Sequence, residues 1–134
     1  MKILSLISIL SLSLIATSCK KKSDTVSSPV TERTIRYVLY TDNDFSNDDN
    51  NIHFTVFIND AGNNRIWDSA LAPMKIKEIP SQLNSLAVEK TLRGNNQSLL
   101  KVGFLYDIEN VGSSQYTDTS NAGTTLKVVN FNFH

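Results

Sequence analysis

Residues 100–108, which read LKVGFLYDI, carry the longest clean alternation of apolar and other side chains in the chain. Every second position is apolar or aromatic: Leu100, Val102, Phe104, Tyr106 and Ile108. Because successive side chains of a β-strand point to opposite faces of its sheet, this alternation predicts a strand with one apolar face. Such a face has to be covered by another layer of structure, so the stretch favours a fold of two packed sheets.

Shorter segments on both sides of this stretch repeat the same pattern. They lie at residues 34–40, 52–59, 65–71, 74–77, 86–92 and 129–133. Asn- and Gly-containing stretches at 59–63 and 93–96 have the composition of hairpin turns. No window shows the apolar spacing of an amphipathic helix. The sequence therefore predicts an all-β fold, an antiparallel β-sandwich of about seven strands over residues 31–134. Immunoglobulin-like, C2-like and transthyretin-like topologies all satisfy this pattern.

The composition narrows the classes of function. The chain has 134 residues, with 13 basic and 13 acidic side chains. A nucleic-acid-binding domain normally carries a basic excess, so we expect no nucleic acid among the partners. A single cysteine excludes an internal disulfide bond and a cysteine-rich zinc site.

The first residues have the features of an export signal. Met1 and Lys2 form a short basic start, and an uncharged run of Ile, Leu and Ser follows at residues 3–15. A membrane-spanning helix needs about 20 apolar residues, so this run fits the apolar core of a secretory signal peptide instead. The run leads into Ala16-Thr17-Ser18-Cys19, which three lysines follow.

Small residues before a lone cysteine resemble the lipobox of bacterial lipoproteins. The resemblance implies that residues 1–18 are removed, that the sulfur of Cys19 receives a diacylglyceryl group, and that the new N-terminus is acylated. It further implies a lipid-anchored protein of the bacterial outer membrane, on the periplasmic or the cell-surface side, with the lipid bilayer as a partner. The alternatives are an ordinary secretory signal with a free Cys19, or an N-terminal core element that buries the cysteine.

Residues 19–30 are expected to comprise the lipidated cysteine and a flexible tether. Residues 20–30 are mostly Lys, Ser and other polar types, include Pro29 and show no periodicity. A flexible segment of this length has an end-to-end distance of about 20 Å, which would keep the folded domain close to the membrane.

A dense polar cluster, TDNDFSNDDNN at residues 41–51, suggests a cation site. Asp42, Asp44 and Asp48 stand at alternate positions, and Ca²⁺ takes six to eight oxygen ligands. The spacing partly resembles the calcium loop of EF-hands, but His53 occupies the place of the bidentate glutamate and the flanks are expected strands. Calcium bound loosely at a tip of the sandwich is therefore a candidate cofactor. The alternative is a solvated Asp- and Asn-rich hairpin loop.

A second long polar connection is expected at residues 109–123, with Tyr116 in its middle. An aromatic ring among Ser, Thr and Asn side chains suits a polar ligand such as a sugar, so Tyr116 is a candidate ligand-binding residue. The alternative is an ordinary loop whose tyrosine folds onto the edge of the sandwich.

The sequence contains none of the common catalytic motifs, and we expect no catalytic residues. The leading hypothesis is a non-enzymatic, membrane-anchored envelope lipoprotein that acts as a binding or structural module. The main alternative is a calcium-stabilised module that binds a glycan or an envelope protein. A small envelope hydrolase, with a site assembled from scattered residues, is a third hypothesis.

Overall fold

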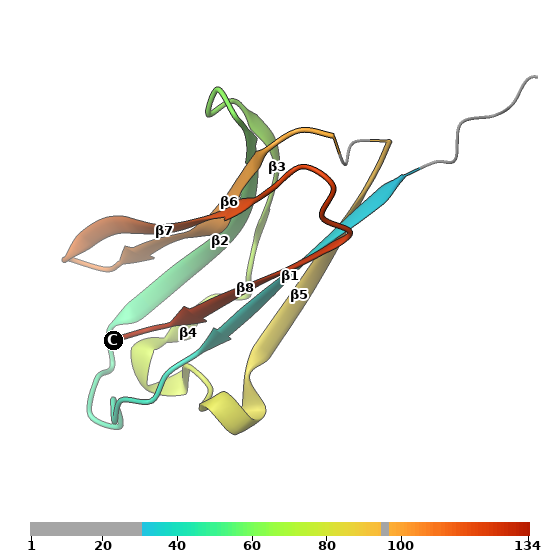
Figure 1. Cartoon of the computed structure of the whole chain (residues 1–134). Coiled ribbons are helices and arrows are strands. Elements are labelled where there is room, and N and C mark those ends of the chain that lie inside the picture. Colours follow the sequence, from blue (N-terminus) through green and yellow to red (C-terminus); the bar gives the residue numbers. More distant parts are fainter. Residues whose placement is uncertain (1–30, 95–96) are drawn as a thin grey trace, which may run out of the picture.

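The computed structural model describes residues 31–94 and 97–134, which form a two-layered β-sandwich (Figure 1). The expected signal peptide, Cys19 and the tether lie outside the described residues. The strands of the described chain are β1 (Glu32–Tyr40), β2 (Asn51–Asp60), β3 (Arg65–Ala70), β4 (Met74–Lys75), β5 (Leu86–Arg93), β6 (Leu100–Ile108), β7 (Gly112–Ser120) and β8 (Leu126–Asn132). Two short 3₁₀ helices, η1 (Ile76–Glu78) and η2 (Gln82–Asn84), lie between β4 and β5.

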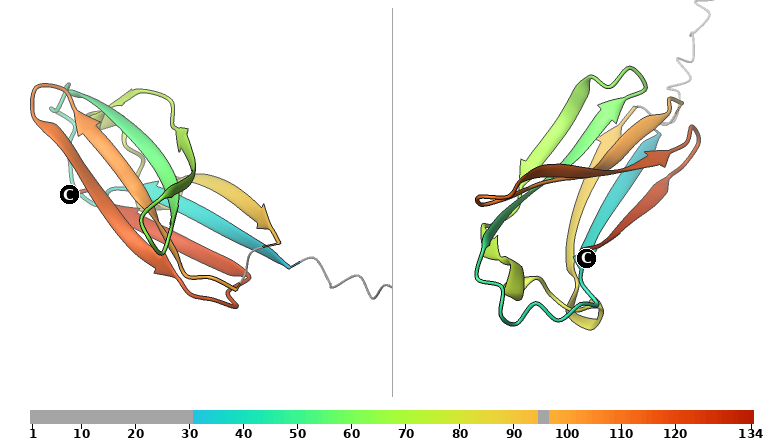
Figure 2. Two further views of the ribbon diagram at one scale, coloured as in Figure 1. Left: turned by 90° about the horizontal axis from the view of Figure 1, so that it is seen from above. Right: turned by 90° about the vertical axis from the view of Figure 1, so that its left-hand side faces the viewer.

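One sheet has the strand order β5-β1-β8, and the other has the order β3-β2-β6-β7, with β4 also paired to β2. Figure 2 shows the two sheets as separate layers. The predicted β-sandwich is thus confirmed, with one strand more than expected. The pairing is antiparallel throughout the described strands except between β1 and β8, which run parallel. Because almost the whole domain separates these two strands in sequence, no tight turn dictates their relative direction.

The core lies between the inward faces of β1, β2, β6 and β8. The alternation predicted from the sequence is seen there directly, and β6 has the bounds expected from residues 100–108. The fully buried positions of β1 include Ile35, Tyr37 and Leu39, and the Tyr37 hydroxyl donates to the Phe57 carbonyl oxygen in the opposite sheet at 2.7 Å. Arg33 continues the inward stripe of β1 and is also buried.

The strand β7 corrects the expectation of a long connection at residues 109–123. Its nine residues form a hairpin with β6 in continuous register, from Leu100 opposite Ser120 to Ile108 opposite Gly112. The turn is tight because Asn110 and Gly112 adopt positive φ angles of 62° and 127°. The sequence did not indicate this strand because Ser, Gln and Thr dominate it, so no apolar stripe marks its inward face.

The expected strand at residues 74–77 is also shorter than predicted. Only Met74 and Lys75 pair with β2, and the chain then turns into η1. Ile76 and Ile79, three residues apart, are both buried, and one turn of 3₁₀ helix places such residues on the same side. The polypeptide thus closes the end of the sandwich instead of extending a sheet.

None of the helices within residues 31–94 and 97–134 has the length and apolar character needed to cross a membrane.

Candidate functional site at one end of the sandwich

The two longest connections between strands in the described chain, residues 41–50 and 76–85, lie at the end of the sandwich opposite the start of β1 (Figure 1). Strand β1 carries the chain from one end to the other, and its nine residues span about 30 Å. Residues 41–50 follow β1, and residues 76–85 pack beside them. We call these two segments together the distal end. Strand β8 runs parallel to β1, so His134 lies at this end as well.

Thr41 fixes the start of the first segment. It is buried, its backbone N–H donates to the Pro80 carbonyl at 2.9 Å, and its hydroxyl donates to the Phe133 carbonyl at 2.7 Å. Phe45, in the middle of the loop, places its ring 5.4 Å from that of Phe133. An aromatic side chain packed on the core gives a polar loop a fixed position, which a chain of Asp and Asn alone would not have.

The carboxylates of Asp42, Asp44 and Asp48, the candidate calcium ligands, do not converge in the described structure. Each is engaged separately, with Asp44 accepting from the Ser46 N–H at 2.9 Å, Asp48 from the Asn50 N–H at 3.0 Å, and Asp42 from the Asn132 side-chain amide at 2.8 Å. Within residues 31–94 and 97–134 no three His, Cys, Asp or Glu side chains form a metal-binding group. Asp44 and Asp48 here serve as local turn formers, because their side chains accept from the backbone two residues ahead.

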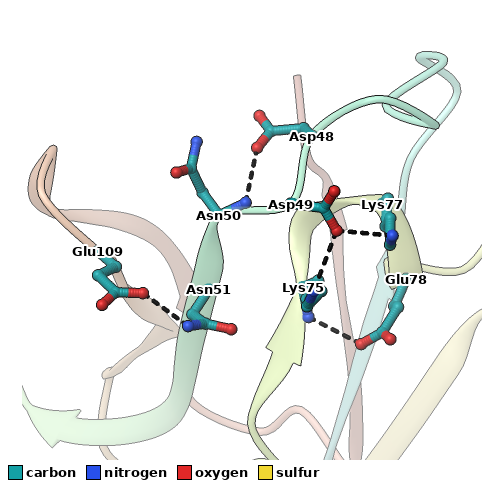
Figure 3. Close-up of polar contacts among 8 residues, drawn as sticks. All are labelled: Asp48, Asp49, Asn50, Asn51, Lys75, Lys77, Glu78 and Glu109. Carbon is teal, nitrogen blue, oxygen red and sulfur yellow. Dashed lines mark hydrogen bonds and ion pairs between the residues drawn. The ribbon is translucent and has the colours of Figure 1, made fainter.

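The fourth aspartate, Asp49, ties the loop to the next segment (Figure 3). Its Oδ1 accepts from Lys75 Nζ at 3.0 Å and from Lys77 Nζ at 2.6 Å. The backbone reinforces this contact, since the Lys77 N–H donates to the Asp48 carbonyl at 3.1 Å and the Ile76 N–H to the Asn50 carbonyl at 3.0 Å. Hydrogen bonds from Lys77 and Lys75 lower the pKa of Asp49, and the same pairing raises the pKa of Lys77.

Between the two segments lies an open depression of about 510 Å³. Its lining combines apolar side chains with polar ones, among them Phe45, Ile76, Ile79, Asp44, Lys77 and Gln82. Leu83, on η2, lines its side and is 97% exposed. A leucine this exposed beside a partly apolar hollow is the most conspicuous unburied apolar group of the described chain.

Tyr116 lies on β7 and not in a loop, which corrects its expected setting. Its ring stacks on Phe131 at a centroid distance of 5.2 Å and an interplanar angle of 21°, and it is partly buried against the core. The ring is thus engaged by the sandwich, as the alternative of a packed tyrosine anticipated. Its role in ligand binding stays a prediction.

The register brings together three residues that no motif of the sequence links. His53 lies opposite Asp107, and Asp107 lies opposite Ser113, on the outer face of the larger sheet. The Ser113 hydroxyl donates to the Asp107 carboxylate at 2.6 Å. No motif could have shown this, because the residues come from three strands and their proximity depends on β7, which the sequence did not indicate.

Comparison of the chain with protein-family models, with curated proteins and with solved structures gives no match in any of the three.

Proposed function

We propose that this protein is a lipid-anchored, non-catalytic binding module of the bacterial envelope, tethered through Cys19, whose distal end contacts a macromolecular partner. The observation that carries the proposal is the placement of the two ends. The described chain begins at Thr31 on one side of the sandwich, and the two longest connections, with the depression between them, lie on the other. A tether joined at Thr31 would leave the distal end as the part of the domain farthest from the anchor.

The chemistry of the distal end suits a protein partner. Leu83 offers an apolar group that a partner could bury, and the depression beside it offers both apolar surface and hydrogen-bonding groups. Interfaces between proteins combine such an apolar centre with a polar rim. The ordered backbone of residues 41–50 and 76–78 lowers the conformational cost of binding, because the loop is already held in place.

The absence of catalysis in this proposal rests on the arrangement of the most suggestive polar groups. In the His53, Asp107 and Ser113 cluster the aspartate lies between the other two residues. A serine nucleophile needs the imidazole beside its hydroxyl and the carboxylate behind the imidazole. In the observed order, Asp107 accepts a hydrogen bond from the serine hydroxyl, and the imidazole is not beside that hydroxyl. The pair also lies on the open outer face of a sheet.

Two measurements test the proposal. Changing Cys19 to Ser should move the protein from the membrane fraction to the soluble fraction of its native cells, and retention in the membrane would contradict the anchor.

For the distal end, a photo-crosslinking amino acid is placed at Leu83 or, as a matched control, at Leu126, which is 54% exposed near the opposite end. We expect a discrete adduct from position 83 that Leu83→Asp protein competes for poorly, and equal adducts from both positions would contradict the assignment.

A further inference from the structure

We infer that the charges of the sandwich are segregated along its long axis so that the end near Thr31 faces an anionic lipid surface and the distal end is held away from it. The inference rests on the proposed anchor, and it adds an orientation that the anchor alone does not impose. A tether of flexible residues would allow the domain to lie on its side.

The distal half of the sandwich is strongly acidic. Residues 41–50 supply four carboxylates, those of Asp42, Asp44, Asp48 and Asp49. Three more carboxylates belong to this half. Glu78 lies on η1, Asp107 lies near the end of β6, and Glu109 directly follows that strand. Lys75 and Lys77 are the basic residues of this half within the described chain, and both contact Asp49. Most of these carboxylates therefore have no cation beside them to offset their charge.

The remainder of the described chain carries the opposite balance. It has seven basic side chains, those of Arg33, Arg36, Arg65, Lys90, Arg93, Lys101 and Lys127. Five acidic side chains accompany them, those of Glu32, Asp60, Asp68, Glu89 and Asp118. Three lysines at residues 20–22 precede this half in the sequence. The molecule thus has an acidic distal end, whereas the rest of the described chain is close to neutral with a small basic excess, because Arg33 is buried and four of the other six basic side chains pair with carboxylates.

The length of the axis makes this separation effective. At physiological ionic strength charges are screened over about 8 Å, whereas the strands span about 30 Å. When the domain stands upright, its acidic end lies beyond the reach of an anionic surface, and the basic residues near Thr31, such as Arg93, lie closest to it. When the domain lies flat, the carboxylates approach the lipid phosphates and are repelled. Standing upright therefore keeps the seven carboxylates of the distal half away from the lipid phosphates, and this difference in repulsion biases the orientation.

The test uses the full lipidated protein in vesicles of phosphatidylethanolamine with or without phosphatidylglycerol. One variant replaces Asn121, at the end near Thr31, with cysteine, and another replaces Asn47 at the distal end; both residues are exposed. Each cysteine carries a fluorophore, and its quenching by quenchers attached to the lipid headgroups measures how close it lies to the membrane surface. We expect the label at position 121 to be quenched more than the label at 47 when phosphatidylglycerol is present. This difference should shrink as salt is raised.

Two arginine variants provide a matched pair. Arg93 pairs with Glu32 and Arg36 pairs with Glu89, both within the same sheet. Arg93 lies at the end near Thr31, whereas Arg36 lies in the middle of β1. Arg93→Glu should reduce the difference between the two labels more than Arg36→Glu, although both change the net charge equally. Equal quenching of both labels, regardless of lipid charge, would overturn the inference. Failure of the protein to bind vesicles at all would instead contradict the anchor.

Discussion

Gly103 shows how one small side chain sets the spacing between two strands. It lies in the middle of β6, and a Cβ at this position would come within 1.9 Å of the carbonyl oxygen of Tyr116 on β7. The β6–β7 hairpin can therefore close only around glycine at this point. In the sequence, Gly103 is an unremarkable member of the alternating stretch, because nothing there reveals the neighbouring backbone.

We expect Gly103→Ala to lower the free energy of unfolding by about 2 kcal/mol or more, since the backbone of β7 must move to accept the methyl group. Urea unfolding followed by tryptophan fluorescence measures the change. Gly62→Ala, in the turn between β2 and β3, is the control, because its Cβ would meet only side-chain atoms at 3.3 Å. Equal losses from the two variants would contradict this account of Gly103.

Tyr37 joins the two sheets through a single hydrogen bond. Its ring packs edge-on against Phe104 at 5.6 Å, and its hydroxyl reaches the Phe57 carbonyl of the opposite sheet. We expect Tyr37→Phe to cost about 1–3 kcal/mol of unfolding free energy, because a buried hydrogen bond between the sheets is lost while the packing is retained. Tyr40→Phe, on the outward face of the same strand, should cost less in the same urea experiment.

Burial raises the pKa of Tyr37 above its ordinary value near 10. The folded protein then holds a proton that the unfolded chain releases, so stability should fall as the pH rises above about 10. Thermal unfolding in this range should show a steeper loss for the wild-type protein than for Tyr37→Phe. Parallel pH profiles would exclude Tyr37 as the cause.

At the scale of elements, the apolar pattern of the sequence predicted those strands whose inward face is continuous. β6 is the clearest example, and β1, β2, β5 and β8 differ from their predicted bounds by a few residues. The failures have a common cause. β7 pairs through backbone hydrogen bonds and contributes Tyr116 as its one large inward side chain, so periodicity alone could not find it.

The distal loop shows the same limit for the candidate site. Composition located the Asp-rich segment correctly, but it could not show that Asp44 and Asp48 turn their oxygens toward their own backbone. Nor could it show that Asp49, the one carboxylate not singled out as a ligand, contacts two lysines from the segment that follows β3. Such pairings depend on tertiary neighbours, which a linear spacing does not encode.

We expect Asp49→Asn to loosen the contact between residues 48–50 and 75–77. Amide hydrogen exchange at Ile76 and Lys77 should accelerate, because the backbone bonds to Asn50 and Asp48 lose the ion pairs that support them. Asp68→Asn, which removes an exposed ion pair with Arg65 in β3, should leave these two amides unchanged. Unaltered exchange in Asp49→Asn would show that the lysine contacts do not hold the loop.

The pKa of Asp49 gives this contact a pH dependence. Because the pKa of the folded state is lowered, the stabilisation is present above the ordinary aspartate value near 3.9 and is lost as the pH falls through the folded value. The protection of the Ile76 amide, measured against its intrinsic exchange rate at each pH, should therefore fall on acidification in the wild-type protein but not in Asp49→Asn.

At the scale of the whole molecule, the parallel pairing of β1 and β8 determines what each end presents. Because both strands run the same way, the described chain begins at one end of the sandwich and the C-terminal residue lies at the other. If β1 and β8 ran antiparallel, the start of the described chain and the C-terminal residue would lie near the same end. The separation would leave the distal end and its acidic loop away from the proposed tether, which is the geometric basis of the proposed function.

The mass of the mature N-terminal peptide, taken from protein purified out of its native membranes, tests the proposed anchor most directly. We predict a chain that starts at Cys19 and carries a diacylglyceryl group on sulfur together with an acyl group on nitrogen. A free Cys19 thiol, or a chain that retains residues 1–18, would contradict the account.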